Sequence, residues 1–168
     1  YLKPGITTKE VDSLARDYII SRDATPSCYN YGGYPGNICI SVNEEVVHGI
    51  PGNRKLCDGD IVTLDICACY KGYHGDSAWS YPIGNIKEEK KYLLEHTEKS
   101  LYEGLKQVKE GARVGDIGYA IENYFKEHNI GVVKELVGNG VGNHLHEDPD
   151  VPNYGKKNTG PIKKKGIV

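Results

Sequence analysis

The sequence predicts an α+β domain made of two similar halves, and three observations lead to this prediction. Three segments carry apolar residues at helical spacing, and the segments between them are rich in β-branched residues and bounded by Gly, Pro and Asn. Helices are followed by strands within each half, which is typical of the α+β class. A sequence repeat then relates the two halves to each other.

The repeat relates the segment that begins at Lys3 to the segment that begins at Lys109. With these lysines aligned, the following glycines, acids, apolar residues and tyrosines also coincide. A few such matches can arise by chance. A true duplication predicts two α/β halves within one domain, residues 1–84 and 85–168, with a ligand site between them.

Three helices are predicted from capping residues and apolar spacing. The first begins after Thr7, which can form a capping box with Glu10. The second begins near Asn85 and ends at Gly111, and the third covers residues 116–128. We expect the second helix to bury an apolar stripe that consists of Ile86, Leu93, Leu94, Thr97, Leu101, Leu105 and Val108.

Strands are predicted in the segments between the first two helices. Residues 38–42 and 60–70 are rich in β-branched and apolar residues. Residues 29–37 contain four glycines and prolines among nine residues, so we expect an irregular loop there.

A hairpin follows from the second of these strands. Lys71–Gly72 is a plausible two-residue turn, which places Cys67 opposite Asp76 and Asp65 opposite Ala78. Asp65 and Asp76 then become diagonal neighbours on one polar face, with side chains about 7–8 Å apart. A three-residue loop would move one aspartate to the other, apolar face.

Two carboxylates on one face of a sheet are costly unless a positive charge lies between them. A metal ion meets this need, and carboxylates bridge ions about 3.5–4 Å apart in two-metal hydrolases. The alternative is a pair of aspartates on a solvated face or at strand ends. The apolar neighbours of Asp65, from Val62 to Ile66, favour the metal site.

Composition narrows the class of protein. The net charge of −2 over 168 residues argues against nucleic acid or a membrane surface as the main partner, and no apolar run approaches membrane-spanning length. The five cysteines are odd in number and contain no Cys-x-x-Cys pair. Reduced thiols in a cytoplasmic protein are the simplest interpretation.

The histidines give weaker signals when each is taken alone. His48 follows a predicted strand, and His144 and His146 alternate after a glycine-rich stretch at residues 138–142. Pro149 excludes a His-Glu-x-x-His zinc helix here, and the glycine spacing is not that of a dinucleotide-binding loop.

Taken together, these motifs resemble the type I methionine aminopeptidases of bacteria. The segments that carry the resemblance occur in order and cover nearly the whole chain: residues 30–35, 38–51, 58–65, 72–76 and 138–149. The resemblance implies the pita-bread fold, in which two pseudo-symmetric halves surround two divalent metal ions (Mn, Fe, Co or Zn). It also implies a cytoplasmic monomer that removes the N-terminal methionine of nascent chains, in association with the ribosome and without direct binding to nucleic acid or membranes.

The resemblance also implies roles for individual residues. Asp65 matches a bidentate metal ligand and Asp76 a bridging ligand, while His48 and His146 match the histidines that contact substrate at the scissile peptide. The residues that match the lining of the methionine pocket are Tyr31, Tyr34, Cys39 and Leu145.

The sequence departs from the family pattern in two places. Asn139 stands where the family has a metal-binding histidine, and the C-terminal part of the fold, with two glutamate ligands, is expected to lie beyond Val168. An amide oxygen is a weaker donor to a transition metal than imidazole nitrogen. We therefore predict impaired activity for this chain, with an inactive domain that binds peptides or proteins as the alternative. A proline- or creatine-directed hydrolase is disfavoured by residues 31–51.

Overall fold

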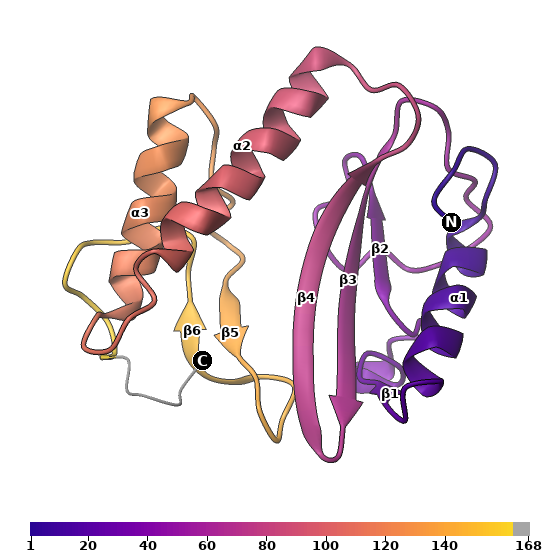
Figure 1. Cartoon of the computed structure of the whole chain (residues 1–168), viewed down its shortest axis with the longest axis horizontal. Helices are drawn as coiled ribbons and strands as arrows, with labels where there is room; N and C mark the ends of the chain where they lie inside the picture. The colour runs from indigo at the N-terminus through magenta and orange to yellow at the C-terminus, as the bar shows by residue number, and fades with distance from the viewer. Residues whose placement is uncertain (163–168) are drawn as a thin grey trace. The chain divides into compact units, whose positions relative to one another are not determined.

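The computed structural model describes residues 1–162, which form two compact units (Figure 1). The first unit comprises Tyr1–Lys90 together with Gly142–Leu145, and the second comprises Lys91–Val141 together with residues 146–162. The boundary that the repeat places between residues 84 and 85 stays a prediction. Within the described part of the chain, no helix has the length and apolar character needed to cross a membrane.

The first helix, α1 (Thr8–Ile20), forms where the capping box predicts it. Thr7 Oγ1 accepts a hydrogen bond from the Glu10 backbone N–H (3.2 Å), and the Glu10 carboxylate accepts one from the Thr7 N–H (2.8 Å). Asp12 on the inner side of α1 accepts a hydrogen bond from the Asn37 N–H at 2.7 Å. The helix thereby holds the irregular loop that leads into the sheet.

The sheet of the first unit is antiparallel and centred on β3. Its strands are β1 (Thr25–Pro26), β2 (Cys39–Val42), β3 (Ile61–Tyr70) and β4 (Tyr73–Pro82). β3 pairs with β4 along its whole length and with both β1 and β2 along its other edge. Both predicted strands are confirmed, with ends that differ by one residue at their starts.

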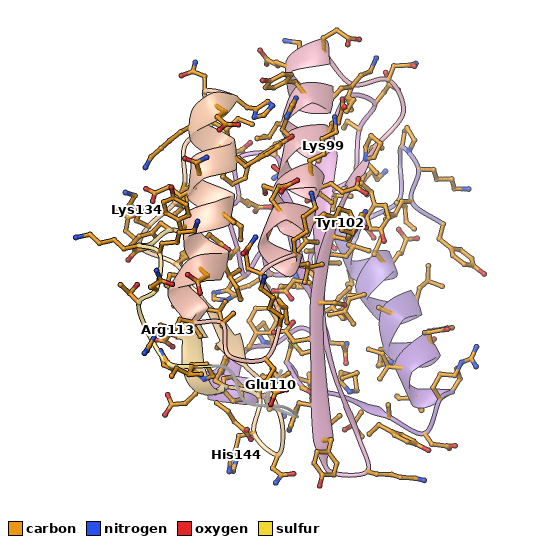
Figure 2. The ribbon with its side chains drawn as sticks, turned by 60° about the vertical axis from the view of Figure 1, so that its left-hand side comes forward. Lys99, Tyr102, Glu110, Arg113, Lys134 and His144 are labelled. Atoms are coloured by element: carbon orange, nitrogen blue, oxygen red, sulfur yellow. The ribbon has the colours of Figure 1, made fainter. Side chains whose placement is uncertain are left out.

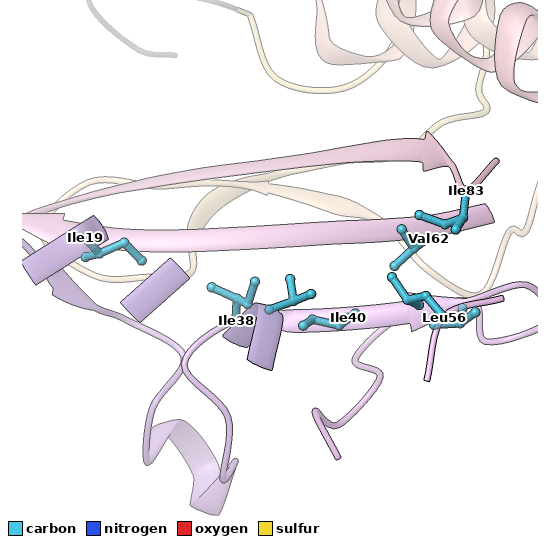
Figure 3. Close-up of a cluster of buried hydrophobic side chains, with 8 residues drawn as sticks. Ile19, Ile38, Ile40, Leu56, Val62 and Ile83 are labelled. Atoms are coloured by element: carbon cyan, nitrogen blue, oxygen red, sulfur yellow. The ribbon is translucent and has the colours of Figure 1, made fainter. Parts of the chain in front are cut away.

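One face of this sheet packs on the hydrophobic core of the first unit (Figure 3). The core joins side chains from α1, β2, β3 and the segments that flank them: Val11, Ile19, Ile38, Ile40, Val42, Leu56, Val62 and Ile83. On β3, Leu64, Ile66 and Ala68 continue the row begun by Val62 and pack against the same cluster. The alternate residues of β3 therefore face the other way.

The predicted hairpin register is confirmed at every position named from the sequence. Cys67 pairs with Asp76, and Asp65 pairs with Ala78. The two turn residues, Lys71–Gly72, have φ values of 51° and 84°. Two consecutive positive φ values are those of a type I′ turn, whose twist matches the strands that it joins.

The second unit contains most of α2 (Glu88–Leu105), with α3 (Val114–Glu127) and a two-stranded antiparallel sheet. The strands of this sheet are β5 (Gly138–Gly140) and β6 (Glu147–Val151). α3 begins two residues earlier than predicted. Its first turn is capped by Asp116, whose carboxylate accepts a hydrogen bond from the Arg113 N–H at 2.8 Å.

The apolar stripe predicted for α2 is wrong in part. Leu101 and Leu105 are 41% and 49% exposed, whereas Ser100 and Gly104 are buried. A Cβ atom on Gly104 would lie only 2.9 Å from Ile121 Cδ1 on α3. Small residues thus form the face on which α3 packs, and hydrophobic spacing does not reveal such a face.

α2 also ends earlier than predicted. The chain leaves the helix after Leu105 through short-range hydrogen bonds, from Gln107 N to the Gly104 carbonyl and from Val108 N to the Leu105 carbonyl, both 2.9 Å. Along the helix itself, Lys99 and Tyr102 extend from the exposed side of α2 (Figure 2).

The lead-ins to α1 and α3 have the same local structure, as the sequence repeat suggests. Gly5 and Gly111 both adopt positive φ, at 91° and 81°. Glu10 and Asp116 both accept a hydrogen bond from the backbone N–H three residues earlier. The repeat therefore extends from sequence to backbone conformation.

The segment after β2 folds back on that strand at Gly49. The Gly49 carbonyl accepts hydrogen bonds from the Ile40 N–H (2.9 Å) and the Tyr34 hydroxyl (2.7 Å), and its own N–H donates to Ser41 Oγ (3.1 Å). A Cβ atom on Gly49 would collide with the Ile40 carbonyl oxygen. Glycine is therefore required for this close approach of two backbones.

We expect Gly49→Ala to lower the free energy of unfolding by about 1–3 kcal/mol, because a methyl group forces two hydrogen-bonded backbones apart. Urea denaturation measures the loss. Gly52→Ala is the matched control, since its nearest neighbour, the Ile50 carbonyl oxygen, lies 4.0 Å away. Equal stability of the two variants would contradict the prediction.

Candidate functional site

The β3–β4 hairpin brings two carboxylates and a thiol together on the face opposite the core. One oxygen of Asp65, one oxygen of Asp76 and the sulfur of Cys67 all lie within 4.8 Å of one another. Asp65 is half-buried, Asp76 is exposed and Cys67 is buried. Asp65 and Asp76, here called the carboxylate pair, are thus the diagonal neighbours that the sequence predicts.

Of the two carboxyl groups, Asp65 has the clearly shifted pKa. Burial, followed by repulsion from the neighbouring Asp76 carboxylate and the hydrogen bond with it, raises the pKa of the Asp65 carboxyl group to about 6. His48 acts in the opposite direction and lowers the pKa of Asp65. An ordinary aspartate would be fully ionised well below this range.

These residues fit a divalent cation. A positive ion between the carboxylates would remove the repulsion that now raises the pKa of Asp65. Carboxylate oxygens bind divalent cations from Mn²⁺ to Zn²⁺, so the oxygen donors alone do not identify one metal.

His48 lies on the loop that Gly49 anchors to β2. Its backbone has a φ of 57°, a left-handed conformation that is uncommon for residues other than glycine and that histidine adopts more readily than most. Such a conformation persists only where the surrounding structure imposes it. Here the hydrogen bonds of Gly49 impose it, and the exposed imidazole lies within electrostatic reach of Asp65.

A group of buried cysteines lies next to the carboxylate pair. The thiol cluster consists of Cys28, Cys39, Cys67 and Leu145, with Tyr34 packed against it. Cys67 belongs both to this cluster and to the group that contains Asp65 and Asp76. The apolar cluster and the carboxylates are therefore adjacent parts of one surface in the first unit.

Two cysteines of the thiol cluster, Cys28 and Cys39, stay protonated at neutral pH because their pKa values are raised. The pKa of Cys39 is raised, first by its hydrogen bond with the Cys28 thiol and then by burial. The hydrogen bond with Cys39 lowers the pKa of Cys28, but the hydrogen bond with Cys67 and burial outweigh it and raise the pKa to about 12. Neutral thiols behave as small, polarisable apolar groups.

The cysteines at 28 and 67 were not among the site residues inferred from the sequence. Cys67 could have been found, because the predicted register places it opposite Asp76 and two residues after Asp65. Cys28 lies outside the sheet and carries no comparable signal.

The residues matched to the methionine pocket do not all lie together. Tyr34, Cys39 and Leu145 meet in the thiol cluster. Tyr31 lies on the short 3₁₀ helix Tyr31–Gly33 and is 52% exposed, outside the cluster. The structure therefore brings three of the four residues together.

The glycine-rich segment that leads to these residues is divided between the two units. Gly142–Leu145 belongs to the first unit, where the Gly142 carbonyl accepts a hydrogen bond from the His74 N–H at 2.7 Å and Leu145 is buried. In the second unit, Asn139 lies on β5, and its Nδ2 donates to the Gly140 carbonyl at 2.7 Å. His146 is exposed and directly precedes β6.

Comparisons with known proteins agree on one family. The family described as "Metallopeptidase family M24" matches residues 1–168. Methionine aminopeptidase 1 of Bacillus subtilis is 54% identical over 168 residues, which are 100% of this chain and 68% of the relative. Methionine aminopeptidase of Clostridium acetobutylicum is 45% identical and matches 99% of this chain and 67% of its own length.

Solved structures give the same result. The crystal structure of methionine aminopeptidase from Rickettsia prowazekii superposes with a TM-score of 0.97 at 38% identity, over 99% of this chain and 67% of that one. Prolidase from Pyrococcus furiosus superposes with a TM-score of 0.79 at 19% identity, over 99% of this chain and 47% of its own, and so shares the fold.

The raised pKa of Asp65 predicts a pH-dependent gain in stability for Asp65→Asn in metal-free protein. The ionised carboxylate destabilises the folded state only above its unfolded pKa, and this effect is complete above pH 6. The variant should therefore match the parent at pH 4 and exceed it by about 1–2 kcal/mol at pH 7.5, after allowance for solvent screening.

Urea unfolding in the presence of a chelator measures this difference. Asp23→Asn is a suitable control, because Asp23 is exposed and its positive φ of 58° also suits asparagine. A stability change that is the same at both pH values would count against the assignment.

Proposed function

Because the chain belongs to metallopeptidase family M24, we propose that it is built to remove the N-terminal methionine of peptides with metal ions held by Asp65 and Asp76. It has the pita-bread fold of that family, and its relatives are methionine aminopeptidases, which are metallo-exopeptidases. The observation that carries the proposal is the contact of the carboxylate pair with the thiol cluster through Cys67.

The family implies that divalent metal is used. We propose two ions, of Mn, Fe, Co or Zn, which Asp65 and Asp76 would hold through their carboxylate oxygens. When bound, the ions supply Lewis-acid activation of the scissile carbonyl. The raised pKa of Asp65 supports this role, because it reports a site where negative charge lacks a counter-ion.

The thiol cluster is the proposed binding surface for the methionine side chain. Cys39, Leu145 and Tyr34 offer apolar and polarisable atoms that suit a thioether, and the neutral thiol of Cys39 adds no charge. Tyr31 is exposed and precedes Tyr34 by three residues, so we propose that it contacts the substrate at the solvent-exposed edge of the thiol cluster. The carboxylate pair beside the cluster would then face the peptide bond that follows the methionine.

Two histidines are proposed to act on the substrate. His48 is within electrostatic reach of Asp65. Its left-handed backbone belongs to the loop that Gly49 anchors to β2, which limits the positions of its side chain. We propose that its imidazole donates a hydrogen bond to the scissile carbonyl. His146 is proposed to assist departure of the peptide nitrogen by proton transfer. The proposed substrates are nascent chains that begin with methionine, and the proposed protein is a cytoplasmic, ribosome-associated monomer.

Asn139 leads us to propose that this chain turns over slowly. It stands where the family pattern has a metal-binding histidine, and a neutral amide oxygen is a weaker ligand for a transition metal than an imidazole nitrogen. The same substitution favours a second candidate function, an inactive domain that still binds peptide N-termini at the thiol cluster. The two candidates differ in metal binding.

We expect Asn139→His to raise turnover of a Met-Ala-Ser peptide by about tenfold or more in the presence of Mn²⁺ or Co²⁺, because it restores an imidazole ligand. The unchanged chain should hardly exceed an Asp65→Ala control. Rapid turnover by the unchanged chain would overturn the proposed impairment. No gain in Asn139→His would weaken the proposed reaction.

Calorimetric titration with Mn²⁺ or Co²⁺ separates the enzyme from the binding domain. The enzyme predicts two equivalents bound at micromolar affinity and weaker binding in Asp76→Ala, because that residue would help to hold the metal. Asp17→Ala, which changes an exposed acid on α1, is the control for nonspecific binding. Absence of binding to the unchanged chain would support the binding domain instead.

A further inference from the structure

Cys67 lies where the carboxylate pair and the thiol cluster meet. It directly opposes Asp76 across the β3–β4 hairpin and follows Asp65 by two residues on the same face of β3. Its sulfur lies within 4.8 Å of one oxygen from each carboxylate. A third donor atom is therefore already directed at the space between the two acids.

The position of the sulfur is fixed by its surroundings. Cys67 is 6% exposed and lies well inside a ten-residue strand that is paired on both edges. On its other side the thiol packs in the buried thiol cluster with Cys28 and Cys39. A side chain held in this way cannot swing far from the carboxylates, so any ion bound between them meets the sulfur.

Bond lengths test whether one ion could reach all three atoms. A zinc–sulfur bond is about 2.3 Å and a zinc–oxygen bond about 2.0–2.2 Å, so two ligands of one ion lie at most about 4.5 Å apart. The three atoms here lie within 4.8 Å before any ion is added. A change of a few tenths of an ångström is therefore enough for all three atoms to bind one ion.

We propose that Cys67 is a metal ligand, which binds through its sulfur together with Asp65 and Asp76. The proposal rests on the proposed function only in taking the carboxylate pair as the place where metal binds. On binding, the S–H bond breaks, its proton passes to solvent and the sulfur lone pair forms the bond to the ion, so nothing is oxidised or reduced.

A sulfur ligand would decide which metals the site prefers. Thiolate is a soft donor that favours Zn²⁺, Co²⁺ and Cd²⁺ over Mn²⁺, whereas carboxylates alone discriminate less. The structure thus assigns to Cys67 the selection of thiophilic ions. Cys67→Ser should weaken binding of Zn²⁺ by about tenfold or more and change binding of Mn²⁺ by less than about twofold.

Titration of the full chain with Co²⁺ tests the bond directly. A cobalt–thiolate bond produces a sulfur-to-metal charge-transfer absorption in the near ultraviolet, which a site made only of oxygen and nitrogen lacks. We expect this absorption in the unchanged chain and in Cys69→Ser, and its loss in Cys67→Ser while Co²⁺ still binds. Cys69 is the matched control, because it lies two residues farther along the same face of β3.

The possible failures are distinguishable. Binding of Co²⁺ that depends on Asp65 but shows no charge-transfer absorption overturns the role of Cys67 and leaves the metal centre intact. Charge-transfer absorption that persists in Cys67→Ser assigns the bond to another thiol and also overturns it. If Co²⁺ does not bind, the proposed function and this inference both fail.

A measurement on the unchanged chain covers the case in which Cys67→Ser does not fold. X-ray absorption of the zinc-loaded protein should show one sulfur scatterer at about 2.3 Å beside oxygen at about 2.0–2.2 Å. The sulfur signal should disappear in Asp65→Asn, which removes a carboxylate from the same ion. A first shell of nitrogen and oxygen alone in the unchanged chain would overturn the proposal.

Discussion

The register of the β3–β4 hairpin is the constraint on which the candidate site depends. Successive side chains of a strand point to opposite faces, so a shift of one residue would separate Asp65 from Asp76 and bury one of them against the hydrophobic core. The left-handed pair Lys71–Gly72 sets this register from one end. The apolar row that begins at Val62 sets it along the strand, because it must face the core. Both determinants select the same pairing.

The first unit uses the two faces of β3 for opposite purposes. One face contributes to a fully apolar core, and the other holds two acids next to a cluster of buried cysteines. Burial of Asp65 beside Asp76 raises the free energy of the metal-free protein, as the pKa of about 6 records. The folded scaffold therefore maintains an electrostatic repulsion that a bound cation would relieve, which is how a structure favours its ligand before the ligand arrives.

The parts of the fold that the sequence predicts best are those governed by local rules. The capping box of Thr7 and the turn at Lys71–Gly72 involve neighbours in the chain, and both form as predicted. The packing of α2 was not predictable in this way, because its contact with α3 uses Gly104, which hydrophobic spacing ignores. Within the site, the carboxylate pair follows from strand periodicity. The packing of Cys28 with Leu145 in one cluster brings together segments that lie far apart in the sequence, and no local pattern predicts it.

The return of Gly142–Leu145 to the first unit has a consequence for the order of folding. The core and the hairpin of that unit are complete within the first 90 residues, but Leu145 is needed to finish the thiol cluster. Contacts between residues so far apart in sequence form late, because the intervening chain must be ordered first. During synthesis, the carboxylate pair would therefore be assembled well before Leu145 completes the thiol cluster beside it. The residues proposed to hold metal would therefore be in place before the cluster proposed to bind the methionine side chain.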